Sequence, residues 1–242
     1  MKIKYLFLFT VLILIFFACN NASEEKHLFI LSGQSNMALL EPKESFIPYV
    51  EKTLGKKKVI VVKQAWGARP IMRWYKKWKL SEFTSPTGAD LYDSLVSKID
   101  LAIYNETLAS VSFFWMQGER DARLSYSAAY EESLMGLHNQ LKEKFDREDV
   151  NFIIGRINDF GFGKEDRYPE WLLVREIQEN FAMSNPNVEW INTDDLNDGY
   201  SRNGKVIEND LHMSAKGYKI LGERFAKKGV ELINNEIKHN LP

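Results

Sequence analysis

The sequence lacks most of the features that mark specialised classes of protein. It contains one cysteine in 242 residues, and its 32 Lys and Arg balance 33 Asp and Glu without a long run of either sign. No basic surface for nucleic acid is therefore expected. Only one long apolar run exists, which excludes several membrane spans, and evenly spread aromatic residues exclude disordered, collagen-like and coiled-coil chains. A uniform composition without repeats predicts a single large globular domain.

The one long apolar run occupies residues 5–18 and follows a basic start. About 14 apolar residues are too few for a transmembrane helix, and the basic start and the small residue before the cysteine are typical of an export signal. The segment Phe16-Phe17-Ala18-Cys19 resembles a bacterial lipobox, with Phe16 where Leu is usual. In such lipoproteins the cysteine is lipidated and becomes the first residue of the mature chain.

We therefore predict a signal peptide over residues 1–18, a lipidated Cys19 with a polar tether over 19–26, and a folded domain over 27–242. The protein would be exported and held on the periplasmic or cell-surface face of a bacterial membrane, through the lipid anchor only. Loss of residues 1–18 would leave Cys19 as the sole thiol, which excludes disulfide bonds and cysteine-ligated metals. The alternative interpretation is an ordinary buried cysteine after an uncleaved anchor.

From residue 27 onward, apolar runs of strand length alternate with longer segments of helical period. The runs are rich in β-branched and aromatic residues, as in strands of a parallel sheet that is buried on both faces. The expected strands cover 27–31, 58–63, 109–116, 151–157 and 188–192, and the expected helices cover 89–104, 125–145, 169–183 and 214–237. Ser214 can cap the last helix, and the segment 67–88, without a clear period, is expected to be a long loop. This alternation predicts an α/β fold.

Residues with catalytic chemistry follow the expected strands. In an open parallel sheet the ligand crevice lies outside the carboxyl ends of the strands. Ser35 follows the first strand, Gly67 the second and Gln117 the third, and His212 stands before the last helix. A serine nucleophile, a histidine base and fixed hydrogen-bond donors are the groups that acyl transfer needs. The donors to the oxyanion could be the backbone N–H groups of Ser35 and Gly67 and the side chain of Gln117.

Three segments resemble sequence blocks of the SGNH hydrolases: Gly33-Gln34-Ser35-Asn36-Met37, Trp115-Met116-Gln117-Gly118-Glu119-Arg120-Asp121 and Asp210-Leu211-His212. The first two together are similar to blocks of carbohydrate esterase family six and of sialate O-acetylesterase-like domains. The resemblance implies a three-layer α/β/α sandwich with a five-stranded parallel sheet of flavodoxin type. It also implies removal of acetyl or other short acyl groups from carbohydrates without a metal or another cofactor.

The same resemblance implies roles for single residues. Ser35 would be the nucleophile and His212 the base, with the oxyanion donors named above. The family's acid usually stands three residues before the histidine, where this chain has Asn209, whereas Asp210 lies two residues before it. We predict that Asp210 orients the imidazole. The alternative is a Ser-His dyad in which His212 works with Asn209 or a carbonyl group.

Further candidates come from the blocks and from residue type. Aromatic faces and guanidinium groups suit sugar rings and their acidic substituents. The candidates for substrate binding are Gln34, Asn36, Trp66, Arg69, Trp74 and Arg156. The resemblance makes Glu119 a buried supporting group beside Gln117, although Glu119 and Asp121 could instead be a carboxylate pair for glycoside hydrolysis. No metal-binding motif is present, so no catalytic metal is expected.

Two functions are compatible with these residues. The first is an exported, lipid-anchored esterase whose partner is an acetylated carbohydrate. The second is a noncatalytic carbohydrate-binding relative, in which the displaced acid marks a decayed site. The joint presence of Ser35, Gly67, Gln117 and His212 favours the enzyme. Sialic acid, xylan and pectin are equally compatible carriers of the acetyl group.

Overall fold

A computed structural model of the chain describes residues 24–81 and 88–239. The predicted signal peptide, Cys19 and most of the tether lie outside the described residues. Among the described helices, none has the length and apolar character that crossing a bilayer requires.

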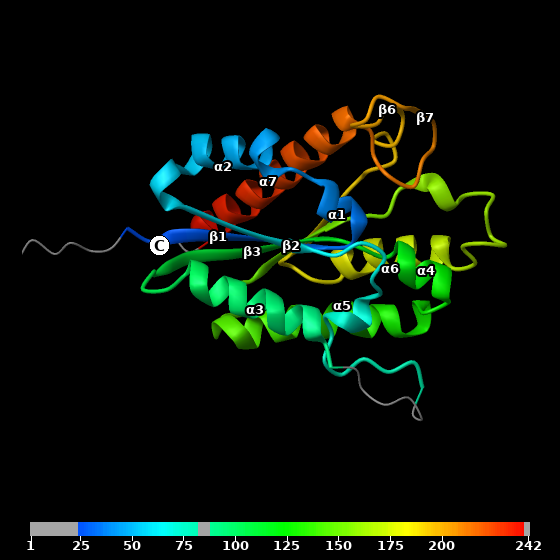
Figure 1. Ribbon diagram of the computed structural model, residues 1–242. Coiled ribbons are helices and arrows are strands. Elements are labelled where there is room, and N and C mark those ends of the chain that lie inside the picture. Colours follow the sequence, from blue (N-terminus) through cyan, green and yellow to red (C-terminus); the bar gives the residue numbers. More distant parts are fainter. Residues whose placement is uncertain (1–23, 82–87, 240–242) are drawn as a thin grey trace, which may run out of the picture.

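A sheet of five parallel strands forms the centre of the molecule (Figure 1). From one edge to the other, the strands are β2 (Val59–Ala65), β1 (Lys26–Gly33), β3 (Leu108–Met116), β4 (Asn151–Gly155) and β5 (Val188–Ile191). The order 2-1-3-4-5 is that of the flavodoxin-like folds. It confirms the predicted five-stranded parallel sheet, although the fourth strand ends two residues earlier than expected.

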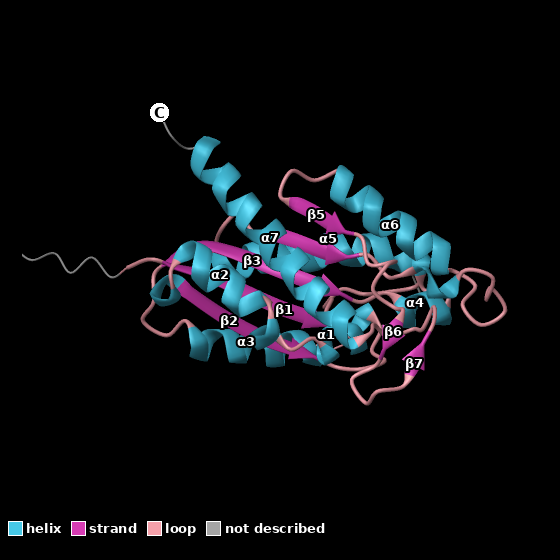
Figure 2. Cartoon of the chain, turned by 90° about the horizontal axis from the view of Figure 1, so that it is seen from above, coloured by secondary structure: helices cyan, strands magenta, loops and turns pink. Residues whose placement is uncertain are grey.

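Helices cover both faces of the sheet and complete three layers. One face carries α2 (Phe46–Leu54) and α7 (Ala215–His239), and the opposite face carries α3 (Asp90–Ala102), α5 (Ser127–Phe145) and α6 (Trp171–Met183) (Figure 1). Two short helices, α1 (Ser35–Leu39) and α4 (Glu119–Leu124), lie at the carboxyl edge of the sheet. The hairpin of β6 (Gly199–Tyr200) and β7 (Val206–Ile207) lies beside this edge (Figure 2).

The core forms because successive strand residues point to opposite faces of the sheet. In β1, Leu28 packs toward α3 and α5, and Phe29 packs toward α2 and α7. In β3, Phe113 lies on the same face as Leu28 and Phe114 on the same face as Phe29. All four side chains are fully buried. This burial on both faces explains why the strands are nearly continuous apolar runs.

The helices differ from the sequence prediction mainly where they are short. The four expected helices are present, and Ser214 Oγ caps α7 by accepting a hydrogen bond from the Gly217 N–H at 3.0 Å. Helices α1, α2 and α4 were not predicted, because five to nine residues are too few for a clear helical period. The described part of the segment 67–88 is a loop with one helical turn at Ile71–Arg73.

Gly33 sets the path of the chain from β1 into the site. Its φ is +141°, and a Cβ at this position would lie 2.1 Å from the Met116 carbonyl oxygen. Only glycine allows the end of β1 to approach the end of β3 so closely. The next residue, Gln34, donates its N–H to the same Met116 oxygen at 2.9 Å. The close approach therefore fixes the backbone immediately before Ser35.

Candidate active site

Three residues predicted for acyl transfer meet in one cavity at the carboxyl edge of the sheet. Ser35, Gly67 and His212 come from the ends of β1 and β2 and from the segment before α7. The cavity has a volume of about 250 Å³. The residues that line it are Gln34, Ser35, Gly67, Ala68, Glu119, Arg120, Arg123, Tyr168, Leu211 and His212. Arg123 and Tyr168 lie outside the three quoted sequence blocks, whereas Arg120 and Leu211 lie inside them but were assigned no role.

Ser35 and Gly67 are brought together by the pairing of β1 with β2. The Trp66 N–H donates to the Gly33 carbonyl oxygen at 3.0 Å, which continues the strand pairing to the site. A Cβ at Gly67 would lie 3.9 Å from the Ser35 Cβ. The Gly67 backbone is therefore a neighbour of the serine, as a donor to an oxyanion on the bound acyl group must be.

His212 follows a turn that uses the side chain of Asp210. Asp210 Oδ1 accepts the backbone N–H of His212 at 2.9 Å, which is the hydrogen bond of an Asx turn. The Asp210 carbonyl oxygen accepts from the side-chain amides of Asn158 at 3.3 Å and Asn197 at 3.2 Å. These three contacts hold the segment that carries His212 at the cavity.

The predicted hydrogen bond from Asp210 to the imidazole is not formed in this arrangement. Within residues 24–81 and 88–239, neither Asp210 nor Asn209 hydrogen-bonds to the His212 ring, and no bond joins the ring to the Ser35 hydroxyl. Asn209 has a left-handed backbone, with φ of 40°, and its Oδ1 accepts from Asn197 Nδ2 at 3.3 Å. Asp210 Oδ1 thus serves the turn, and the support of the imidazole by Asp210, by Asn209 or by a carbonyl group stays a prediction.

Asn36 joins the segments around the cavity instead of facing it. Its Nδ2 donates to Glu119 Oε1 at 2.9 Å and to the Leu211 carbonyl oxygen at 3.1 Å, and its Oδ1 accepts from Tyr218 Oη at 2.9 Å. Both ends of the buried amide are therefore occupied by the protein. The expectation that Asn36 binds substrate was wrong, because no polar atom of its side chain is left for a ligand.

Gln117 is buried behind the cavity, and its amide is committed to the protein. Its side chain is 0% exposed, and Nε2 donates to Gln34 Oε1 at 3.3 Å, to the Arg69 carbonyl oxygen at 3.1 Å and to Asp121 Oδ2. The two amide hydrogens already face three protein acceptors. The predicted role of Gln117 as a direct donor to the oxyanion is therefore corrected, because its N–H groups do not reach the cavity.

Two carboxyl groups of the third block are fully buried beside the site. Burial raises the pKa of Glu119 to about 7 and that of Asp121 to about 7. Asp121 accepts the Ile71 N–H at 3.0 Å in addition to the Gln117 amide, whereas Glu119 Oε2 has no partner in the described part of the chain. Their contacts to Asn36 and Gln117 make them supports of the cavity wall, and Asp121 does not line the cavity as a glycosidase carboxylate would.

Two aromatic or cationic candidates lie outside the cavity. Trp74 is fully buried, donates from Nε1 to Ser32 Oγ at 3.1 Å, and packs edge-on against Trp115. Arg156 binds the side chains of Glu179, Asn192 and Asp194 and lies over the Trp190 ring. The expected sugar contacts of Trp74 and Arg156 were therefore wrong, since the fold already uses both side chains.

Trp66 and Arg69 are the aromatic and cationic candidates that remain accessible. The indole of Trp66 is 50% exposed and directly precedes Gly67. Arg69 is also exposed, and its carbonyl oxygen is held by Gln117. Both therefore stay available for contact with a sugar beside the cavity.

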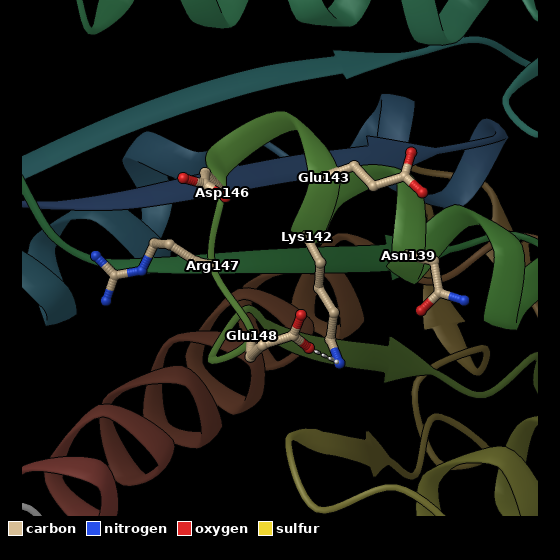
Figure 3. A pocket seen from close by; sticks show the side chains of 6 residues that line it. All are labelled: Asn139, Lys142, Glu143, Asp146, Arg147 and Glu148. Carbon is tan, nitrogen blue, oxygen red and sulfur yellow. Dashed lines mark hydrogen bonds and ion pairs between the residues drawn. The ribbon is translucent and has the colours of Figure 1, made fainter.

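A second hollow in the described part of the chain lies away from these residues. Its volume is about 420 Å³, and it lies at the end of α5 and in the residues that follow. It is lined mainly by charged side chains, among them the ion pair of Lys142 and Glu148 at 3.3 Å, which are drawn in Figure 3. It precedes β4 and therefore lies at the opposite end of the sheet from Ser35. No group of three or more acidic, histidine or cysteine side chains suited to a metal occurs in the described segments.

The comparisons with known proteins identify the family of the chain. The family model described as carbohydrate esterase, sialic acid-specific acetylesterase, matches residues 38–231. No protein with curated annotation matches the chain.

Several solved structures share the fold. A protein of Arabidopsis thaliana has 18% identity and a TM-score of 0.64, over 86% of this chain and 98% of that one. A carbohydrate acetylesterase of Xanthomonas citri has 14% identity and a TM-score of 0.63, over 86% of this chain and 57% of that one. A carbohydrate esterase family 3 protein of Talaromyces cellulolyticus has 10% identity and a TM-score of 0.55, over 87% and 99%.

The flavodoxin-like sheet carries Ser35, Gly67 and His212 at its carboxyl edge. The match to the family model covers more than half of the chain. The chain therefore belongs to the carbohydrate esterase family of sialic acid-specific acetylesterases, and it is a carboxylic ester hydrolase.

Proposed function

We propose that the protein removes acetyl or other short acyl groups from carbohydrates through an acyl-enzyme on Ser35. One observation carries the proposal, namely that Ser35, Gly67 and His212, from three distant parts of the sequence, line a single cavity. A cavity of about 250 Å³ is smaller than a typical pocket for a drug-sized ligand, and it suits the acyl group better than a whole oligosaccharide. The sugar would then extend beyond the cavity.

The reaction would proceed in two steps. A ring nitrogen of His212 takes the proton of Ser35 Oγ as the oxygen attacks the ester carbonyl carbon, and the backbone N–H groups of Ser35 and Gly67 stabilise the oxyanion. His212 then gives the proton to the departing sugar oxygen, which leaves an acetyl ester on Ser35. In the second step His212 takes a proton from water, the resulting hydroxide attacks the acetyl group, and acetate leaves as Ser35 regains its proton.

The surroundings of the cavity support a carbohydrate as the alcohol part of the ester. A further hollow of about 420 Å³ shares His212 with the cavity and is lined in part by Arg202 and Lys205 of the β6–β7 hairpin. On the other side, Trp66 is half-exposed next to Gly67. Arg202 is paired with Glu44 at 2.7 Å, so Lys205 and the indole of Trp66 are the groups that suit a sugar with acidic substituents.

No carboxylate within the described residues touches the His212 ring, so turnover is the direct test of the catalytic proposal against the noncatalytic binding relative. Hydrolysis of p-nitrophenyl acetate by the wild type and by Ser35→Ala separates the two functions. The esterase proposal expects turnover that Ser35→Ala removes, and equal rates for both proteins would refute it. Acetate release from acetylated sialic acid, xylan and pectin would then identify the carrier.

The location of the enzyme is part of the proposal. The export signal over residues 1–18 and the lipobox-like cysteine support an esterase that is lipid-anchored to a bacterial membrane through Cys19. An anchored enzyme of this kind would act on acetylated glycans outside the cytoplasm.

A further inference from the structure

We infer that the side-chain amide of Gln34 is the third donor to the oxyanion, held in place by Gln117 and Asp121. The inference rests on the esterase function proposed above. It assigns to Gln34 the role that the sequence pattern suggested for Gln117. The two amides lie in contact, but only Gln34 lines the cavity.

The orientation of the Gln34 amide is set by two hydrogen bonds to its oxygen. Oε1 accepts from Gln117 Nε2 at 3.3 Å and from the Arg120 backbone N–H at 3.2 Å. Turning the amide over would place its NH₂ group against two donors and lose both bonds. Nε2 must therefore point away from Gln117 and Arg120, and it meets no acceptor in residues 24–81 and 88–239. The side chain is only 3% exposed and lines the cavity, so its free N–H groups are available to a ligand there.

Gln117 is itself fixed by a buried carboxyl group. Its Nε2 faces Asp121 Oδ2, the Arg69 carbonyl oxygen and Gln34 Oε1, so the reversed amide would set oxygen against three acceptors. The carbonyl oxygen of its backbone accepts from Tyr130 Oη at 2.7 Å and from Gln178 Nε2 at 2.8 Å. Gln117 and Asp121 are thus positioning residues, which act on the substrate only through Gln34.

The backbone of Gln34 is as rigid as its side chain. Its N–H donates to the Met116 carbonyl oxygen at 2.9 Å, and its own carbonyl oxygen accepts from the Ala38 N–H at 2.8 Å. A donor that is already oriented before the reaction costs no reorganisation when negative charge develops, which makes it effective in the transition state. A nearly buried amide next to the nucleophile is placed for the acyl group, whereas exposed Trp66 and Arg69 are placed for the sugar.

The variant Gln34→Glu tests this role with little change in shape. One carboxylate oxygen can still accept from Gln117 and Arg120, while the other replaces the N–H groups that face the cavity. Gln34→Leu is the uncharged second variant. Gln64→Leu, on the edge strand β2, is the matched control, because it also exchanges an amide for an apolar side chain.

The measurement is kcat and KM of the full chain with p-nitrophenyl acetate, which has no sugar, and with glucose pentaacetate. Loss of one oxyanion donor costs roughly a hundredfold to a thousandfold in kcat. We expect that loss in Gln34→Glu and Gln34→Leu for both esters, with KM within about threefold of the wild type and Gln64→Leu within about threefold in both constants.

A folded Gln34→Glu or Gln34→Leu with kcat close to the wild type would overturn the inference. It would also be overturned if the loss were confined to the sugar ester or to KM, because Gln34 would then bind the sugar. If the wild type hydrolysed neither ester, the proposed function itself would fail. An active wild type, an inactive Ser35→Ala and an active Gln34→Glu would leave the esterase intact and refute only the role of Gln34.

Discussion

The buried carboxyl group of Glu119 should make the stability of the protein depend on pH, and the variant Glu119→Gln should remove the part of that dependence that comes from Glu119. Glu119 is 3% exposed, and burial raises its pKa from 4.5 to about 7 in the folded protein. Between these two values the folded state keeps the proton and the unfolded chain releases it. The free energy of unfolding therefore falls as pH rises through this window and changes no further above it.

The size of the effect follows from the difference between the two pKa values. Each pKa unit corresponds to about 1.4 kcal/mol. The free energy of unfolding therefore falls by about 3 kcal/mol in total as the pH rises from 4.5 to 7. The amide of Glu119→Gln keeps an oxygen that can accept from Asn36 Nδ2, but it carries no charge at any pH. Repulsion from Glu119 also raises the pKa of Asp121. The variant removes this repulsion, which likewise stabilises the folded protein relative to the wild type as the pH rises.

Urea unfolding followed by tryptophan fluorescence at several pH values measures this difference. We expect Glu119→Gln to gain about 3 kcal/mol of stability relative to the wild type as the pH rises from 4.5 to 7.5. Glu176→Gln, which alters an exposed side chain on α6, is the control. A difference between Glu119→Gln and the wild type that stays constant with pH, within about 0.5 kcal/mol, would refute the burial argument.

The remaining predictions concern the reaction and the anchor. Ser35→Ala and His212→Ala should each remove nearly all turnover of p-nitrophenyl acetate, and the double variant should be little worse than either, because the two residues act as one unit; additive losses would contradict this. Asp210 accepts the backbone N–H of His212, and the amide oxygen of Asp210→Asn can still accept it, so kcat should fall less than tenfold. A loss of orders of magnitude would instead show that the Asp210 carboxylate orients the His212 ring during catalysis. Asn209→Ala should likewise be mild, and a severe loss would show that Asn209 supports the histidine. Cys19→Ser should abolish incorporation of labelled fatty acid. A variant that stays membrane-bound, together with a wild type that takes up no label, would refute the lipid anchor.

The sheet could be predicted from the sequence because both of its faces are buried. Neighbouring residues such as Leu28 and Phe29 pack into different halves of the core, so the middle of the strand is a continuous apolar run. The positions of Ser35 and Gly67 follow from that pattern, since adjacent parallel strands end at the same edge. Short helices such as α2 stabilise the fold through packing and leave too little periodicity to detect.

The fine structure of the site could not be predicted because it depends on contacts between distant segments. Gln34 and Gln117 are both amides that follow strands, and the sequence does not show which one turns toward the cavity. The answer comes from Asp121 and from the Arg69 carbonyl oxygen, which attract the Gln117 amide away from the cavity. The burial of Trp74 could not be predicted either. An aromatic residue in a segment without a clear period can bind a sugar or pack in the core.

The covalent intermediate on Ser35 is the central claim, and mass spectrometry of the acid-quenched enzyme after brief exposure to p-nitrophenyl acetate tests it most directly. The account predicts an acetyl group on the peptide that contains Ser35 in the wild type. It predicts no acetylated active-site peptide in Ser35→Ala. Steady release of acetate with no acetylated Ser35 would contradict the account. So would an acetyl intermediate on another side chain whose substitution abolishes turnover.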